Sequence, residues 1–406
     1  GLSFVNNAKL RASYGRTGNN QIADFASIGL LGTVNQPFGL GGGSNNIGLT
    51  TLTASNPDLT WEIADQKDFG ADFSLFKNRL NITFDYFNKV TQSLLLNVNV
   101  TSTSGYPSVL QNIGKMKTSG IELTANFKIL DGAFKWNIGG NLATMNQEVL
   151  QLGLDGSPLI GFYGTLVTKV GGKLEEGRGL HAIGILSQKD IDSHIPLFGA
   201  SKAGDYKFED VNHDGIVDGF NQADGVLLGN NNPKLIYGIT SSISYKNFDL
   251  SILILGQQGA SLYDLFYQLG GIGGGTGINS HSFYYDGRYI SETNPGDGKT
   301  PRAGYFGAGT PNNYYQQSTD YTRIRNVTLG YNIPLSLYAK TPVKSLRAYL
   351  TADNLATFTT FLGGNPNTTR QGSANATTGD GRFIGLNSIP SVPLPRSFAF
   401  GLNVNF

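Results

Sequence analysis

The sequence predicts an all-β fold, a transmembrane antiparallel β-barrel to which this chain contributes about 11 strands. Three observations predict it: a hydrophobic period of two, an alternation of short turns with long loops, and a composition rich in glycine and aromatic residues. The 406 residues include 55 Gly, 24 Phe and 19 Tyr, although only 39% are hydrophobic. This composition suits strands with Gly-rich turns and aromatic girdles better than it suits stacked helices.

The C-terminal stretch Ser397–Phe406 shows the period of two most clearly. Its alternate positions are large and apolar: Phe398, Phe400, Leu402, Val404 and Phe406. The residues between them are small or polar, so an extended strand has one hydrophobic face. A strand of a soluble β-sandwich shows the same alternation. Because the sequence ends on Phe with no polar tail after the strand, we expect a strand that contacts lipid.

Earlier strands follow the same pattern. They are expected over residues 8–14, 61–75, 80–86, 121–129, 134–142, 235–245, 248–254, 327–333 and 346–350. Short polar turns, such as Lys77–Arg79, alternate with long loops, such as Thr17–Asp58 and residues 148–232. Outer-membrane barrels have short periplasmic turns and long extracellular loops. We therefore expect the loop at 148–232 to be extracellular and the C-terminus to be periplasmic.

Composition and charge exclude several classes of function. Lys and Arg number 30 and Asp and Glu 29, with no basic stripe, which argues against nucleic acid as a partner. No run of 18 apolar residues is present, so no transmembrane helix is expected. The absence of Cys excludes disulfides and thiol nucleophiles. No Ser-His-acid arrangement is recognisable, and we predict that the protein is not an enzyme.

The expected strand count is odd, and the first and last strands each have an unpaired edge. A lipid-exposed edge is costly because its backbone groups have no hydrogen-bond partner. We therefore expect the chain to be the C-terminal half of a larger barrel whose remaining strands come from elsewhere.

Several polar segments between the strands carry a resemblance to a known family. The sequence resembles the C-terminal part of SusC/RagA-like TonB-dependent transporters, which are outer-membrane nutrient importers typical of Bacteroidota. The matching segments occur in the family's order across nearly the whole chain. They are residues 9–19, 56–62, 79–89, 112–115, 119–122, 204–215, 325–331, 353–355 and 394–398.

The resemblance implies a barrel of about 22 strands, an N-terminal plug, a segment that contacts TonB and a SusD-like surface lipoprotein. Residues 1–406 would then supply barrel wall, extracellular loops and the terminal strand that acts as an assembly signal. The plug and the first barrel strands are expected to precede residue 1. The implied function is import of a glycan or oligopeptide nutrient. The alternative is a non-transporting structural or docking barrel in a secretion or surface-assembly complex.

One segment of the long loop has the spacing of a calcium-binding loop. Oxygen-bearing side chains recur at every second position, and Gly215 lies where such loops turn sharply. Asn221 occupies the position of the usual final acid, and Asp224 is expected to replace it. A set of metal-free Asx turns is the alternative interpretation. The predicted ligands of a structural Ca²⁺ are Asp210, Asn212, Asp214, the Ile216 carbonyl, Asp218 and Asp224.

Aromatic residues are dense between the strands expected at 248–254 and 327–333. Aromatic faces beside polar groups suit sugar rings or peptides, so these residues are candidates for substrate contact. Packing of the loops on each other or on a lid lipoprotein is the alternative. The predicted substrate-contacting residues are Tyr284, Tyr285, Tyr314 and Tyr315.

Overall fold

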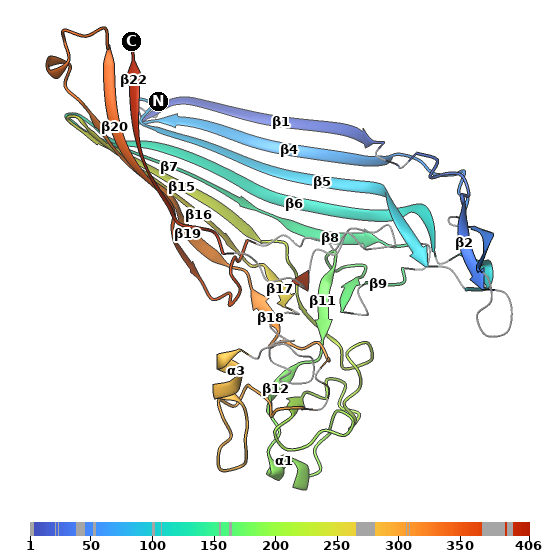
Figure 1. Ribbon diagram of the computed structural model, residues 1–406. Helices are drawn as coiled ribbons and strands as arrows, with labels where there is room; N and C mark the ends of the chain where they lie inside the picture. Colours follow the sequence, from blue (N-terminus) through green and yellow to red (C-terminus); the bar gives the residue numbers. More distant parts are fainter. Residues whose placement is uncertain are drawn as a thin grey trace.

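One curved antiparallel sheet dominates the computed structural model of the chain (Figure 1). The structure describes all residues except 1–3, 21, 23, 38–44, 52–53, 100–101, 107, 154–155, 162–164, 265–280, 306, 308, 368–385 and 388–392. Figure 1 shows both termini at the end of the sheet where the turns are short, and the long loops gathered at the other end. No helix among the described residues is long and apolar enough to span a membrane.

Eleven strands form this sheet. Ten of them are hydrogen-bonded in the order β1-β4-β5-β6-β7-β15-β16-β19-β20-β22, and β8 pairs with β6 beside β7. The all-β fold and the strand count expected from the sequence are confirmed. The strands are β1 Val5–Asn19, β4 Glu62–Leu75, β5 Leu80–Asn99, β6 Ser108–Asp131, β7 Phe134–Thr144, β8 Asn146–Gln151, β15 Leu235–Tyr245, β16 Phe248–Gln258, β19 Tyr321–Asn332, β20 Ser345–Thr359 and β22 Ser397–Asn405.

Several strands are longer than the sequence predicts, and one hairpin was not expected. β5 and β6 extend well beyond residues 80–86 and 121–129, and they remain paired out to Asn99 and Ser108. The pairing of the two strands shifts register between Gln92 and Leu95 and continues beyond that point. The expected loop Thr17–Asp58 also contains a hairpin of β2 Leu31–Pro37 and β3 Asn45–Thr51.

Register assigns one face of the sheet to lipid. Phe398, Phe400 and Leu402 pair with Ala352, Leu350 and Ala348 of β20, so apolar side chains from adjacent strands lie in rows. The five predicted large residues of the terminal strand are 40–72% exposed, which places them on the outer surface and not in a core. This arrangement is the one expected of a barrel wall in contact with acyl chains.

Aromatic pairs mark the short-turn end of that outer face. Phe248 and Tyr331 lie 4.7 Å apart between ring centroids, and Phe134 and Tyr245 lie 6.2 Å apart. Each pair is directly opposite in register on neighbouring strands. Aromatic belts of this kind form where a barrel wall meets the membrane interface.

Ion pairs on the inner face connect strands that are not adjacent. The Arg347 guanidinium on β20 donates to both carboxylate oxygens of Asp249 on β16, across β19. Gly330 of β19 lies beneath this contact, and a Cβ atom added there would be 2.6 Å from Arg347 Cζ. The Arg11 guanidinium similarly crosses Gly70 to reach Asp85, with an N–O distance of 2.9 Å. A glycine on the middle strand therefore lets each pair span three strands.

The hydrophobic core lies outside this sheet, apart from Val149 of the short strand β8. Every buried hydrophobic residue in the described chain falls between Val149 and Phe361. We use "loop domain" for the described residues of 152–234 and 259–320. Its elements are β9 Leu159–Gly161, β10 Leu166–Thr168, β11 Glu176–Gly179, β12 Ala182–Ile185, α1 Gln188–Asp192, β13 Tyr206–Phe208, β14 Val226–Gly229, β17 Ser261–Asp264, α3 Ser282–Gly287 and β18 Gln316–Ser318; β17 also pairs with β21 Leu386–Asn387.

Substituting Gly330→Ala should destabilise the barrel by about 1–3 kcal/mol, because the new methyl group displaces Arg347 from Asp249. The matched control is Gly140→Ala in β7, where the nearest atom to an added Cβ is Gly238 O at 3.6 Å. Denaturant unfolding of the full-length protein in detergent measures the difference. Equal stability of the two variants would contradict this role for the glycine.

Candidate binding site in the long loops

Tyrosine rings form the centre of the loop domain. Tyr206 on β13 lies edge-on to Tyr305 at 5.2 Å between centroids and stacks on Tyr314 at 5.4 Å. The hydroxyl of Tyr206 donates to that of Tyr315 at 3.1 Å, and the hydroxyls of Tyr305 and Tyr315 are 2.7 Å apart. Loops far apart in sequence are thus joined through one aromatic cluster.

The buried hydroxyls of this cluster stay protonated. Burial raises the pKa of Tyr315 well above its ordinary value, and the nearby Tyr206 and Tyr305 raise it further. Burial also raises the pKa of Tyr263. A neutral phenol both donates and accepts, so these groups act as hydrogen-bonding elements of a core and not as proton-transfer groups.

The structure corrects most of the predicted substrate contacts. Tyr284 and Tyr315 are 4% and 2% exposed, so neither presents a ring face to a ligand. Tyr314 is half-buried against Tyr206. These three rings pack the loops together, which was the alternative interpretation. Only Tyr285 projects, with 65% exposure and the Arg288 guanidinium 4.2 Å from its ring centroid.

The segment 210–224 folds as a series of tight side-chain-to-backbone turns. Asp210 Oδ2 accepts from the Gly215 amide at 2.9 Å, and Asn212 Oδ1 accepts from the Asp214 amide at 3.1 Å. Asp214 Oδ1 accepts from the Ile216 amide at 2.9 Å. Gly215 has a φ of 87°, a value that glycine adopts without strain. The first half of the predicted calcium loop is therefore present as a compact turn.

Asp224 is more deeply buried than the other predicted ligands. It is fully buried, and its two carboxylate oxygens accept from the amides of Val211 and Asp218 at 2.7 and 2.6 Å. Burial of a charged carboxylate is tolerated here because backbone N–H groups surround it. Asp224 thus links the backbone at Val211 to the backbone at Asp218.

The fit of a cation to this segment rests on Asp210. Its Oδ1 atom is buried without a hydrogen-bond partner. An orphaned carboxylate oxygen is an atom that a bound cation would satisfy. Across the described residues, however, no three His, Cys, Asp or Glu side chains are positioned to share one metal ion. Calcium binding therefore stays a prediction.

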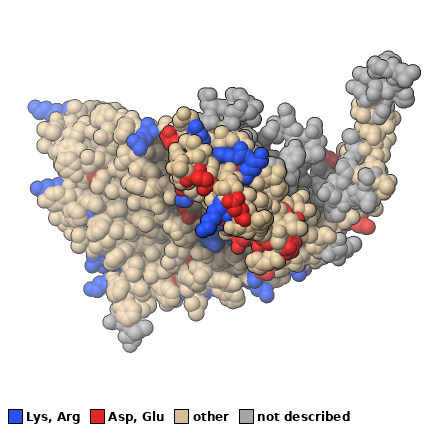
Figure 2. Space-filling model, turned by 90° about the horizontal axis from the view of Figure 1, so that it is seen from below, with Lys and Arg blue, Asp and Glu red and all other residues tan. Residues whose placement is uncertain are grey.

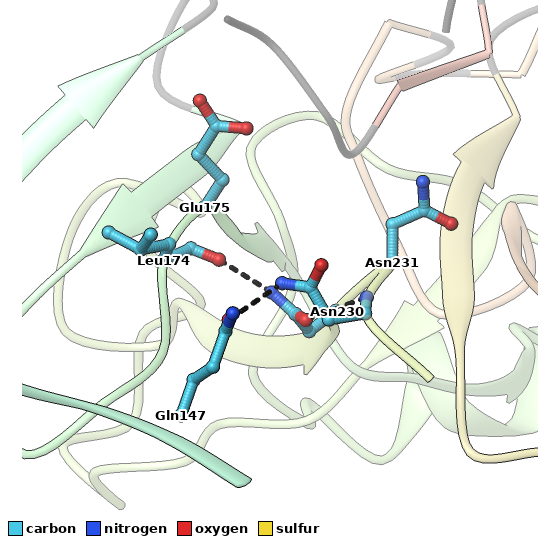
Figure 3. A pocket seen from close by; sticks show the side chains of 6 residues that line it. Gln147, Leu174, Glu175, Asn230 and Asn231 are labelled. Carbon is cyan, nitrogen blue, oxygen red and sulfur yellow. Dashed lines mark hydrogen bonds between the residues drawn. The ribbon is translucent and has the colours of Figure 1, made fainter. Parts of the chain in front are cut away.

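A small amide-lined pocket lies where the loop domain meets β8 (Figure 3). It has a volume of about 70 Å³. Asn230 Nδ2 donates to the Leu174 carbonyl at 2.5 Å, and Asn232 Nδ2 donates to Gln147 Oε1 at 3.0 Å. Figure 3 shows the Glu175 carboxylate directed away from this contact. The pocket has room for more than one water molecule.

Charged side chains of both signs gather over the loop domain when the molecule is viewed from that end (Figure 2). One internal pair is Asp205, fully buried, whose Oδ1 lies 2.7 Å from Arg302 Nε. Another is Lys207, whose Nζ donates to Asp190 Oδ1 at 2.7 Å. These pairs stabilise the loops and leave no single sign of charge dominant.

Asp190 also closes a capping box at the start of α1. Its Oδ2 accepts from the backbone N–H and the hydroxyl of Ser187 at 2.9 and 2.7 Å, and its own N–H donates to Ser187 Oγ. Burial opposes ionisation of Asp190, but the hydrogen bonds from Lys207 and Ser187 outweigh it and lower its pKa to about 2. The ionised carboxylate therefore holds α1 to β13.

Comparison with known proteins identifies related sequences and folds. The sequence model of a family described as TonB dependent receptor-like, beta-barrel matches residues 1–355. The TonB-dependent receptor P26 of Formosa agariphila is 32% identical, over 98% of this chain and 40% of that protein. The TonB-dependent receptor SusC of Bacteroides thetaiotaomicron is 24% identical, over 100% of this chain and 38% of that protein.

Among solved structures, that of the RagAB peptide transporter superposes with a TM-score of 0.79. Its sequence identity is 20%, over 99% of this chain and 41% of that chain, and the likeness concerns the fold. The chain spans about 40% of the length of these curated relatives.

Acidification should destabilise the α1 region. The pKa of Asp190 in the folded protein is about 2, below its ordinary value of 3.8. The ionised carboxylate therefore contributes about 2 kcal/mol to the free energy of unfolding. This contribution is complete above about pH 5 and disappears as the pH falls towards 2. Asp190→Asn should reproduce this loss at pH 7. Hydrogen exchange of peptides from 182–208, corrected for intrinsic rates, measures it, with Asp192→Asn in the same helix as control. A pH-independent stability of these peptides would refute the assignment.

Proposed function

The chain belongs to the TonB-dependent receptor-like β-barrel family, and we propose from this premise that it forms part of an outer-membrane importer for a glycan or an oligopeptide. The observation that carries the proposal is the division of the sheet into two faces. The outer face is apolar, and the inner face carries charged pairs such as Arg347–Asp249. A wall of this kind encloses a polar passage within lipid.

Import by this protein requires no covalent chemistry. The loop domain would capture the nutrient at the long-loop end, and the polar inner face would provide hydrogen-bonding groups along the passage. Energy would reach the barrel through TonB, by way of a plug that residues 1–406 do not supply. Further strands would complete the barrel, because β1 and β22 each pair on one side only within the described sheet.

We propose that a SusD-like surface lipoprotein assists capture. The likeness to SusC and to the fold of the RagAB peptide transporter supports this partner. Tyr285 with its stacked Arg288 is the exposed aromatic group of the loop domain that best suits such a contact, or a contact with the nutrient itself. The C-terminus would be periplasmic, because it lies at the short-turn end (Figure 1).

We further propose a structural Ca²⁺ held by the turn at 210–218. Asp210, Asn212, Asp214, the Ile216 carbonyl and Asp218 would supply the oxygen ligands, and Asp224, the remaining predicted ligand, would hold the turn through its bonds to the Val211 and Asp218 amides. The support is the buried, unpartnered Asp210 Oδ1. Such an ion would stiffen the loop domain through charge neutralisation.

Deleting the gene for the full-length protein should abolish growth on the transported oligomer and leave growth on its monomers intact. Loss of TonB should have the same effect, because the passage opens only when energy is supplied. Uptake of labelled oligosaccharide mixtures and of a labelled casein digest by deletion and complemented cells measures this. Normal uptake together with a defect in protein secretion or surface assembly would instead favour a structural or docking barrel.

Calcium removal should loosen the loop domain. Calorimetric titration of the full-length protein is expected to give a dissociation constant on the order of 10⁻⁴ to 10⁻³ M, as in other extracellular calcium sites. Asp210→Asn should abolish this binding and increase chymotrypsin cleavage within 180–230, whereas Asp286→Asn on the exposed side of α3 should change neither. Identical binding by both variants would rule out this site.

A further inference from the structure

A second cavity, of about 230 Å³, lies on the barrel wall at the long-loop end of β19 and β20. Its lining includes two arginines, Arg323 and Arg396, together with Asn354, Thr357 and Thr359. Arg323 is on the inner face, because its neighbour Ile324 pairs with Ile254 in the lipid-facing rows. The cavity therefore opens on the side through which a transported molecule would pass.

Arg323 is a buried charge without an acidic partner. It is 5% exposed, and its guanidinium donates to Thr357 Oγ1 at 2.9 Å and to Asn365 Oδ1 at 3.0 Å. Its carbon Cζ lies 4.8 Å from the ring centroid of Tyr321. All three partners are neutral, and no carboxylate of the described residues forms an ion pair with Arg323.

Other arginines of the wall are neutralised within the chain. Arg11 pairs with Asp72 and Asp85, Arg16 pairs with Asp65, and Arg347 pairs with Asp249. Arg323 is the most buried of these four arginines. A buried charge without a counter-charge is more costly than an exposed one, so Arg323 has the greatest need of a carboxylate partner. A guanidinium has five N–H donors, and the two hydrogen bonds of Arg323 leave donors available to a planar acceptor.

Arg396 adds a second positive charge to the same cavity. It is exposed and makes no ion pair within the described chain. The preceding residue is anchored, since Asn354 Nδ2 donates to the Pro395 carbonyl at 3.1 Å. Asn354 lies at a register shift in the β19–β20 pairing and has a φ of 51°. The irregular backbone at Asn354 thus fixes the segment that carries Arg396 beside Arg323.

We propose that this pocket binds a carboxylate group of the imported oligomer, with Arg323 as the buried anchor and Arg396 as the outer clamp. The inference rests on the proposed import function and narrows its substrate to oligomers that carry carboxylates. Two guanidinium groups and the hydroxyl of Thr357, which accepts from Arg323 and keeps its own proton to donate, match the charge and the acceptor atoms of a carboxylate. The carboxylate belongs either to an oligouronide or to a peptide.

Calorimetric titration of the full-length protein in detergent tests the proposal. The probes are trigalacturonate and its methyl ester for the glycan source, and triglutamate and its fully amidated form for the peptide source. We expect one of the two acids to bind and its neutral counterpart to fail. Binding of that acid should weaken as sodium chloride is raised.

Variants locate the binding within the pocket. Arg396→Gln should weaken binding of the acid about 10- to 100-fold, because a charge-assisted hydrogen bond to the ligand is lost. Arg323→Gln, which keeps a side-chain donor for Thr357, should weaken it at least as much. The matched control is Lys340→Gln, an exposed position in the turn between β19 and β20 that removes the same unit of charge. Thermal unfolding checks that each variant is folded.

Two results would overturn the proposal. The first is equal binding of an acid and its neutral counterpart, and the second is equal effects of Arg396→Gln and Lys340→Gln. Uptake by cells is a separate readout: TonB-dependent uptake without any binding of the acids would end this proposal and leave the import function standing.

Discussion

Backbone hydrogen bonding in lipid is the constraint on which the rest of this structure depends. No water is present there to satisfy an N–H or C=O group, so each membrane-spanning strand needs a neighbour on both sides. The unbroken order from β1 to β22 meets that requirement for all but the two outermost strands. It also fixes which residues face lipid, because antiparallel register places Phe400 beside Leu350 and Phe398 beside Ala352. The position of a residue along its strand therefore determines whether its side chain faces lipid or the passage.

A wall with lipid on one side and a polar passage on the other cannot bury a hydrophobic core of its own. The described chain accordingly places its buried hydrophobic residues in the loops, with Val149 of the short strand β8 as the exception. Tyrosine suits that place because its ring supplies apolar area while its hydroxyl finds a partner, as Tyr206, Tyr305 and Tyr315 do for one another. Rigid loops at the mouth of a passage can present groups such as Tyr285 and Arg288 at little entropic cost on binding.

The sequence predicted the sheet well because its information is local. A period of two and a polar turn are visible within about ten residues, and register follows from the hydrophobic face. The loop domain was predicted poorly for the opposite reason. Whether Tyr285 projects and Tyr315 is buried depends on contacts between segments more than a hundred residues apart, such as Tyr206 with Tyr315. The calcium-like spacing identified a real turn, but the role of Asp224 as a buried fastener required the three-dimensional structure.

The arginines of the inner face differ in their partners, and this difference separates those that stabilise the wall from the one that we propose binds a ligand. Arg347 and Arg11 each reach over a glycine to an aspartate two strands away, so their charge is neutralised by the wall itself. Arg323 lies on the same face, is more deeply buried, and meets only neutral acceptors. The strand pairing that supplies aspartates to the other two does not supply one here. A buried guanidinium without a carboxylate partner in the barrel wall is suited to bind the anionic group of a ligand.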